Sequence, residues 1–233
     1  MKKLLLSGII FLAAAFLTFA GDAAAFVDLG LSNDGKTYVF AEYGKTDRNF
    51  QGYAEIYTVD IAKNDFIDGG VFRTSPSAST ASKSGKKVYE ELYSKASWYL
   101  KRYNLKPVDA DNLLYVRDES KPSDSEIVFK DFESSTADKS IYYHIKLEKN
   151  VIGNGASLKS SFFIGLEKQD ENGHVISRNV VGSPDIKRKL VTDYTIDRIF
   201  SDKSGRNLVF VVEKKLSDSN GISIRYMVET IRL

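Results

Sequence analysis

The sequence contains no cysteine, two histidines, one tryptophan and four prolines among its 233 residues. Without cysteine the chain forms no disulfide and carries no lipid on an N-terminal cysteine, so its fold depends on a packed core. The scarcity of histidine removes the commonest metal ligand. Neither sign of charge dominates, because 33 lysines and arginines are balanced by 31 aspartates and glutamates. The charges are interspersed and provide no basic patch of the kind that binds nucleic acid.

The only long apolar run lies at the start of the chain. A basic start precedes the run Leu4–Phe19, and small residues follow it. This order is typical of a secretory signal peptide. The run of about 16 residues is shorter than the roughly 20 that span a bilayer, which favours cleavage over an uncleaved anchor. The A-x-A pattern ending at Ala25 predicts a signal peptide at 1–25, and Ala20 ends a second candidate site.

We therefore expect an exported protein, periplasmic or extracellular, with residues 26–233 forming a single β-rich domain. No later segment is apolar over a sufficient length to span a membrane, so no stable membrane span is expected after cleavage of the signal.

Most of the mature chain has the pattern of β-strands. Apolar and polar residues alternate with a period of two in 141–148 and 222–228, which marks half-buried strands. Residues 208–212 are continuously apolar, which predicts a strand buried on both faces. The segments 162–166 and 175–181 flank Asn-Gly, the favoured pair of a hairpin turn.

One segment, about 86–104, predicts an amphipathic helix. Its apolar stripe has helical spacing and consists of Val88, Leu92, Ala96, Tyr99 and Tyr103. Ser84 is the expected N-cap, and Asn104 and Pro107 are expected to end the helix. The stripe could face a ligand, but we expect it to pack on a sheet, with Trp98 partly buried beside it. The sequence thus predicts a mainly β (α+β) fold, an antiparallel sheet or sandwich with one prominent helix.

The two ends of the mature chain resemble each other. Residues 27–40 and 196–210 each contain a strand, a polar turn with glycine and a second strand, and each continues into a third strand. Part of this likeness follows from turn chemistry, because Asp, Asn and Gly are the residues that tight turns require. We expect the two three-stranded units to lie near each other in one sheet system, although no sequence feature specifies the strand order.

The first unit resembles a known repeat. Ser32-Asn33-Asp34-Gly35-Lys36, followed by the strands at 38–40 and 56–60, is similar to one blade of the WD40-like repeat of TolB-type β-propellers. Asn33 replaces the usual proline, and the C-terminal copy has an insertion in its turn and Glu229 in place of an aspartate. No blade signature lies between residues 66 and 192, so a complete β-propeller is not expected.

The layout of the whole chain resembles a family of uncharacterised, predicted secreted bacterial proteins known as a domain of unknown function. The likeness rests on the signal peptide, the opening Phe26-Val27-Asp28-Leu29-Gly30 with the turn that follows it, the helix rich in Tyr, Lys and Ala, and the blade-like strands at the end. It implies export and gives no activity, so no functional residues are carried over from the family.

No catalytic, cofactor-binding or metal-binding residue is predicted, and we expect no cofactor. His144 and His174 are expected on the surface, without the spacing of a metal site. The turn around Asp34 lacks the regular oxygen ligands of a calcium loop. The Gly-rich segment 153–156 lacks the lysine and helix of a phosphate loop and is expected to be a turn. The carboxylate pairs Glu90-Glu91 and Asp109 with Asp111 are expected by chance in so charged a chain.

Two functions from different classes fit this pattern. The first is an exported, non-enzymatic module that binds an envelope protein or a surface polymer, with sheet edges available to pair with a partner. The second is a periplasmic small-molecule or lipid-binding protein, in which the helix and the aromatic residues enclose an apolar pocket. The space between the helix and its sheet distinguishes them. The sequence does not specify the oligomeric state.

Overall fold

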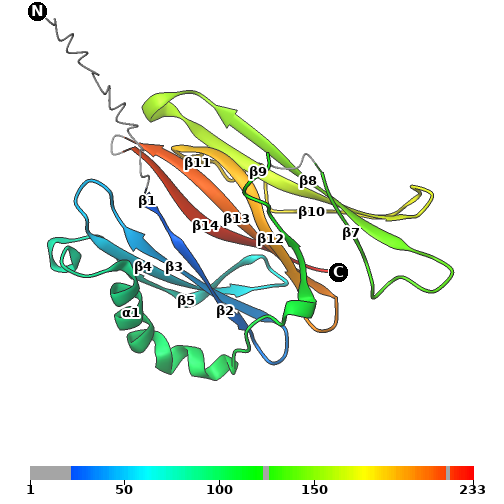
Figure 1. The fold of residues 1–233 in the computed structure, drawn as a ribbon, viewed down its shortest axis with the longest axis horizontal. Helices are drawn as coiled ribbons and strands as arrows, with labels where there is room; N and C mark the ends of the chain where they lie inside the picture. Colours follow the sequence, from blue (N-terminus) through cyan, green and yellow to red (C-terminus); the bar gives the residue numbers. More distant parts are fainter. Residues whose placement is uncertain (1–21, 123–125, 219–220) are drawn as a thin grey trace, which may run out of the picture.

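The structure is a computed structural model that describes residues 22–122, 126–218 and 221–233 (Figure 1). Most of the expected signal peptide lies outside these residues, apart from its last four. The expectation of a mainly β fold with one prominent helix is confirmed, and the sheets close into neither a barrel nor a propeller within the described residues. The strands are β1 (Asp22–Ala23), β2 (Ala25–Leu31), β3 (Thr37–Lys45), β4 (Gly52–Asp60), β5 (Asp65–Thr74), β6 (Leu113–Val116), β7 (Ile127–Lys130), β8 (Ile141–Ile152), β9 (Lys159–Asp170), β10 (Val175–Val181), β11 (Arg188–Lys189), β12 (Val191–Ser201), β13 (Asn207–Asp218) and β14 (Gly221–Arg232).

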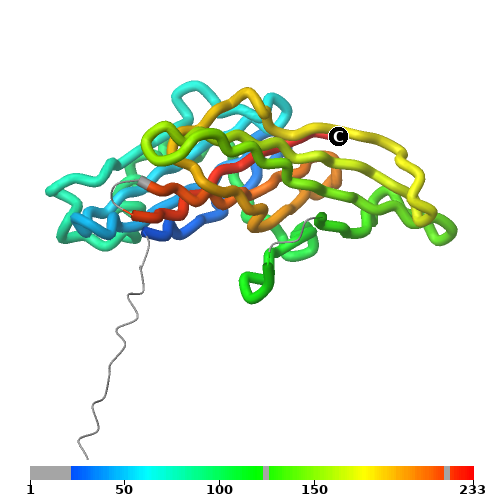
Figure 2. The backbone as a smooth tube through the Cα atoms, turned by 90° about the horizontal axis from the view of Figure 1, so that it is seen from above, coloured from blue at the N-terminus to red at the C-terminus, as the bar shows by residue number. Residues whose placement is uncertain are grey.

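These strands form three sheets. The N-terminal sheet has the order β2-β3-β4-β5, the central sheet β1-β14-β13-β12-β6, and the outer sheet β10-β9-β8-β7 with β11 also on β9. All pairings are antiparallel except that of β1 with β14. Figure 2 shows an elongated molecule, with the N-terminal sheet at one end and the turns that join β7 to β8 and β9 to β10 at the other.

The helix and the three sheets stack as four layers with an apolar core between each neighbouring pair. The helix α1 (Gly85–Leu100) packs on the N-terminal sheet, the N-terminal sheet on the central sheet, and the central sheet on the outer sheet. Strand β13 supplies residues to two cores, since Leu208, Phe210 and Val212 face the outer sheet while Val209 and Val211 face the N-terminal sheet. The prediction that residues 208–212 are buried on both faces is therefore confirmed.

The helix has the predicted ends. Ser84 caps it, accepting a hydrogen bond from the Lys87 N–H at 3.1 Å. A short 3₁₀ turn follows, and Asn104 ends it in the left-handed conformation with φ of 47°. The apolar stripe packs on the sheet as expected. The expectation for Trp98 was wrong: its side chain is 66% exposed, because it lies off the stripe, beside Arg102.

The start of the helix lies very close to β3. A Cβ on Gly85 would stand 2.6 Å from the carbonyl oxygen of Gly44. Only glycine permits this approach, which brings the stripe of α1 down onto β3 and β4.

The two similar terminal units pack against each other in adjacent sheets. Strands β2–β4 belong to the N-terminal sheet and β12–β14 to the central sheet. Their turns also meet, because Asn207 Nδ2 donates to the Gly35 carbonyl at 2.9 Å. The predicted hairpin of β9 and β10 is confirmed, with Gly173 at φ of 81°.

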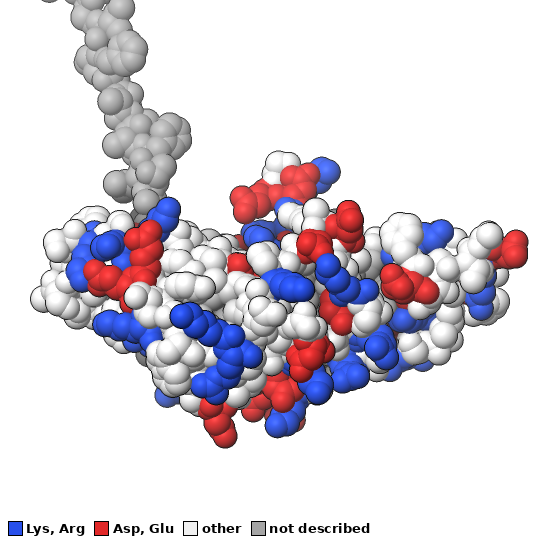
Figure 3. Space-filling view, turned by 90° about the horizontal axis from the view of Figure 1, so that it is seen from below, with Lys and Arg blue, Asp and Glu red and all other residues white. Residues whose placement is uncertain are grey.

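Across the described ranges, no helix has the length and apolar character needed to cross a membrane. Lys, Arg, Asp and Glu are interspersed over the face of the molecule shown in Figure 3.

Candidate functional site

The interface between α1 and the N-terminal sheet is filled with side chains. Val39, Ala41 and Ile56 on the sheet and Ala96 on the helix are each 0% exposed. Tyr99 and Phe72 pack edge to face across the same layer, with ring centroids 5.2 Å apart. The aromatic and apolar residues of the helix therefore pack in the core. They do not enclose the pocket that the ligand-binding alternative expected there.

A cleft of about 740 Å³ lies elsewhere, along the open edge of β14. We call it the intersheet cleft. One wall is the face of β4 and β5, the other is the segment from Val180 to Arg188 that joins β10 to β11, and β14 forms the base between them. This volume lies in the range of small-molecule sites.

A row of stacked aromatic rings forms the apolar wall of the intersheet cleft. Phe40 stacks on Tyr57 with centroids 4.8 Å apart, and Tyr57 stacks on Phe66 at 5.1 Å. The row runs from β3 through β4 to β5, because cross-strand neighbours on one face of a sheet stand side by side. Phe40 is 1% exposed and Phe66 is 44% exposed. The row thus extends from the core to the lip of the cleft.

The backbone of β14 is only partly covered at this edge. The Tyr226 N–H donates to Glu42 Oε2 at 2.7 Å, and the Thr230 N–H donates to Asn64 Oδ1 at 2.6 Å. Backbone groups along a strand alternate in direction with a period of two. The N–H of Val228, midway between these two residues, therefore points toward the same side, and Val228 lines the cleft.

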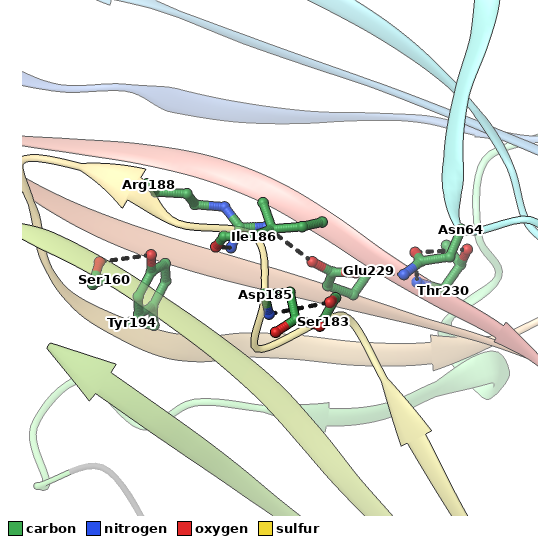
Figure 4. A network of polar contacts seen from close by, with 9 residues as sticks. All are labelled: Asn64, Ser160, Ser183, Asp185, Ile186, Arg188, Tyr194, Glu229 and Thr230. Atoms are coloured by element: carbon green, nitrogen blue, oxygen red, sulfur yellow. Dashed lines mark hydrogen bonds and ion pairs between the residues drawn. The ribbon is translucent and has the colours of Figure 1, made fainter.

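The buried carboxylate of Glu229 lies on β14, at the base of the cleft. Glu229 is 5% exposed, lies 3.4 Å from Arg188 NH2 and accepts a hydrogen bond from Asn64 Nδ2 at 2.5 Å (Figure 4). Burial raises its pKa above the ordinary value, and Asn64 and Arg188 act in the opposite direction. A carboxylate held this way fixes the position of the arginine opposite it.

Arg188 is held by aromatic rings as well. Its guanidinium lies 4.9 Å from the ring centroid of Phe162 and 5.9 Å from that of Tyr194. The Tyr194 hydroxyl is in turn 2.8 Å from Ser160 Oγ (Figure 4). Stacking and ion pairing together order the side chain, so this cation stands at a defined place in the wall.

A second cation of the cleft, Lys214, lacks such a partner. Among the described residues, no carboxylate lies within ion-pair distance of its ammonium group. Burial lowers the pKa of Lys214, and the charges of Glu42 and Glu55 act in the opposite direction. By contrast, Arg73 is paired with Glu55 at 3.1 Å.

Glu42 is a buried acid whose charge acts on Lys214. It is 2% exposed, and burial raises its pKa from 4.5 to about 6, against the effects of Lys214 and of the Tyr226 N–H. Pairs of buried groups with displaced pKa values are enriched at functional sites. Lys214 lines the intersheet cleft, and the charge of the buried Glu42 acts on it, so this cleft is the strongest candidate site among the described residues.

A smaller cleft of about 340 Å³ lies where the two terminal units meet at their turns. Its lining includes charged side chains of both signs, and Lys203 pairs with Asp109 across it at 3.0 Å. Mutually paired surface charges leave less for a ligand to recognise, so the intersheet cleft is the better candidate.

The residues considered from sequence lie outside the intersheet cleft. His174 is exposed beside its turn, 3.2 Å from Asp170, and His144 is half-buried, 3.1 Å from Glu126. Asp34 accepts hydrogen bonds within its own turn, as expected. Residues 153–156 form the turn between β8 and β9.

The carboxylate pairs named from sequence are also dispersed. Glu90 and Asp111 are exposed, and Glu91 forms an ion pair with Lys83 at 2.7 Å. Over the described part of the chain, no cluster of three or more His, Cys, Asp or Glu side chains could hold a metal ion.

Sequence reasoning missed the charged residues in and beside the cleft, although three of them carried a signal. Glu42 continues the inward-facing series Tyr38 and Phe40 of an apolar strand, and Glu229 follows Met227 on one face of β14. A charge at an inward position of a strand marks a buried polar group that requires a partner. Lys214 carried the same mark, since it continues the inward series Leu208, Phe210 and Val212 of β13, whereas Arg188 carried none.

One family model matches the chain, and it covers residues 39–232. That family is described as "Predicted secreted protein (DUF2259)". No curated protein sequence and no solved structure gives a significant match.

Proposed function

The chain belongs to the DUF2259 family of predicted secreted proteins, and we propose that it acts after export as a non-enzymatic binding protein whose intersheet cleft holds a small anionic amphiphile. The family description supports export, and the expected resemblance to a secreted family of unknown function is confirmed. The proposed ligand has an apolar body and a carboxylate or similar anionic head, as a fatty acid has.

The observation that carries the proposal is the pairing of an aromatic wall with an ammonium group that lacks a carboxylate partner. The stacked rings of Phe40, Tyr57 and Phe66 offer an apolar surface from the core to the lip. Lys214 lines the same cleft. Lys214 is half-buried, and a charge partly withdrawn from water gains from a partner, so an anionic head group beside Lys214 would supply the missing counter-charge.

The charge balance of the lining favours an anion over a cation. Five basic residues line the cleft, Lys63, Arg73, Arg188, Lys214 and Arg232, against two acidic ones, Asp65 and Glu229. Glu229 is already occupied by Arg188 and Asn64. A cationic ligand would therefore meet no free buried carboxylate among the lining residues, whereas an anion meets Lys214.

The test is a calorimetric titration of the purified exported protein with three ligands that share one chain: dodecanoate, dodecanol and dodecylamine. We expect one dodecanoate to bind per protein, dodecanol to bind more weakly, and dodecylamine to bind least. Equal binding of all three would show that the apolar wall acts without Lys214, and no binding of any would reject the proposal.

Lys214 and its neighbour provide a matched pair of variants. The Lys214→Met variant removes the ammonium inside the cleft, and Lys215→Met removes one on the opposite face of the same strand, outside the cleft lining. A charged hydrogen bond contributes about 1.5–3 kcal/mol, so we expect at least a tenfold loss of dodecanoate affinity in the first variant and no loss in the second.

A second candidate function retains the protein- or surface-binding module predicted from sequence. Strand β10 ends the outer sheet, and Val175, Ile176 and Val180 on it are 39%, 51% and 63% exposed. An apolar edge strand can pair with an extended segment of an envelope protein. This candidate predicts that Ile176→Lys abolishes capture of one defined envelope protein while Lys214→Met leaves that capture intact.

A further inference from the structure

Residues at the very start of the described chain are built into the fold. Asp22 is 8% exposed, and its Oδ2 accepts a hydrogen bond from Arg225 NH2 at 2.5 Å. Its Oδ1 accepts from the Tyr53 hydroxyl at 2.9 Å, and its carbonyl oxygen accepts from Arg225 NH1 at 3.0 Å. We call these contacts the N-terminal clip. They join β1 to β14 of its own sheet and to β4 of the N-terminal sheet.

Arg225 depends on this clip for its partner. Its guanidinium lies 4.2 Å from the ring centroid of Tyr53, and its side chain is 19% exposed. The Asp22 carboxylate is the only one within ion-pair distance of Arg225 among the described residues. Without Asp22, a largely buried cation would lose its carboxylate partner and the Tyr53 hydroxyl its acceptor, which is strongly unfavourable.

The backbone of the same residues is also paired. Asp22 and Ala23 lie in register with Ser223 and Ile224 in the parallel pair β1–β14, and the Ala24 N–H donates to the Ile224 carbonyl at 3.0 Å. Ala24 is 7% exposed, and Ala25 pairs with Tyr43 at the start of β2. Every residue from 22 to 25 therefore contributes to the folded domain.

The sequence contains two candidate cleavage sites, after Ala20 and after Ala25, and the A-x-A pattern favours the second. Cleavage after Ala25 would remove β1 and the whole N-terminal clip. Cleavage after Ala20 would leave both in place.

We infer that the signal is removed after Ala20 and that the mature protein begins at Gly21. Signal removal acts on the unfolded chain, so the fold does not hide the second site. The inference rests on what the mature domain needs: Asp22 satisfies Arg225 and Tyr53, and β1 covers the part of the β14 edge that precedes the intersheet cleft.

The test is the N-terminal sequence and intact mass of the full-length chain after export from a bacterial host, purified through a C-terminal tag. We expect a single N-terminus at Gly21. A chain beginning at Phe26, an uncleaved chain beginning at Met1, or any other N-terminus would overturn the inference.

A second measurement tests the reason behind it. Chains made without a signal and beginning at Gly21, Ala24 or Phe26 would be compared by thermal unfolding. We expect the chain from Gly21 to have the highest melting temperature, and the chain from Ala24, which keeps part of the backbone pairing and loses Asp22, to melt well below it. Equal melting of the Gly21 and Phe26 chains would contradict the structural role of the clip.

Discussion

The two faces of the N-terminal sheet are built from alternate residues of the same strands, yet one packs through an apolar layer alone and the other includes buried polar and charged groups. On the helix face, Val39, Ala41 and Ile56 are fully buried against α1. On the opposite face, aromatic residues share the interface with the buried acid Glu42 and with the tyrosine that binds Asp22.

This difference in polarity between the two faces indicates which face is the better candidate for a functional site. An apolar layer fills space and needs no ligand to be complete. Buried charges oppose folding unless each finds a partner, and the second face holds charges whose pairing depends on distant parts of the chain. Arg225 finds its partner in residue 22, whereas Lys214 finds none among the described side chains. We therefore expect substitutions on the helix face to change stability alone, and substitutions on the opposite face to affect ligand binding as well.

The largest expected effect lies on the helix face. Leu92 is 4% exposed within the α1 core, so Leu92→Ala removes buried methyl groups and leaves a cavity. We expect a loss of about 3 kcal/mol in the free energy of unfolding, measured by urea denaturation. Dodecanoate affinity below the transition should be unchanged. An equal loss of affinity would show that the two faces are coupled.

Next in size is removal of the N-terminal clip. Asp22→Ala leaves Arg225 without its carboxylate, which costs about 3–5 kcal/mol for a fully buried pair. Since both side chains retain some exposure, we expect about 2–3 kcal/mol. Asp47→Ala is the control, because Asp47 is an exposed aspartate that lines the same small pocket as Asp22. Matching losses in the two variants would remove the special role of Asp22.

The pH dependence of the free energy of unfolding tests the raised pKa of Glu42. Its folded pKa of about 6 lies above the ordinary 4.5, so the folded state holds a proton that the unfolded state releases between these values. The resulting stability is present below pH 4.5 and is lost as pH rises through 6. The wild type should lose about 2 kcal/mol between pH 4 and pH 7.5 relative to Glu42→Gln.

Urea denaturation of both chains at the two pH values measures this difference. The subtraction is needed because burial also raises the pKa of Glu229 and gives a slope of the same sign. Lys214, Glu55, Arg225 and the Tyr226 N–H also act on Glu42. A wild type that gains stability relative to Glu42→Gln over this range would contradict the raised pKa of this buried acid.

The smallest expected effect is at the lip of the cleft. Phe66 is 44% exposed and stacks on Tyr57, so Phe66→Ala should change the free energy of unfolding by about 1 kcal/mol or less. Dodecanoate affinity should fall several-fold, because the outer part of the apolar wall is gone. Full affinity in this variant, measured by calorimetry, would place the ligand deeper or elsewhere.

Much of the fold could be predicted because it depends on local pattern. The period of two located β8 and β14, Asn172-Gly173 located a hairpin, and Ser84 and Asn104 located the ends of the helix. The stacking of three sheets could not be predicted in this way, because strand order is a property of long-range pairing. The burial of Trp98 was predicted wrongly for a related reason. Helical spacing indicates which residues face the sheet, but it does not specify how far around the helix the contact with the sheet extends.

The candidate site could not be located from sequence. Glu42, Lys214 and Glu229 carried a signal at inward positions of strands, but the contacts of Glu229 with Asn64 and Arg188, and the closeness of Glu42 to Lys214, depend on long-range packing of the sheets. From the sequence, the helix stripe was expected to pack on the sheet, and only the ligand-binding alternative placed a pocket under the helix. The rings of the helix do pack in the core, and the open aromatic row lies on the other face of the same sheet.

The most direct test of the account is to follow backbone amide signals of the ¹⁵N-labelled protein by NMR during titration with dodecanoate. We predict that the largest shifts occur at Val228 and Gly182, which line the intersheet cleft, and that Ala41 and Ala96 on the helix face do not move. Shifts concentrated at α1, or a saturating titration that leaves Val228 unmoved, would contradict the account.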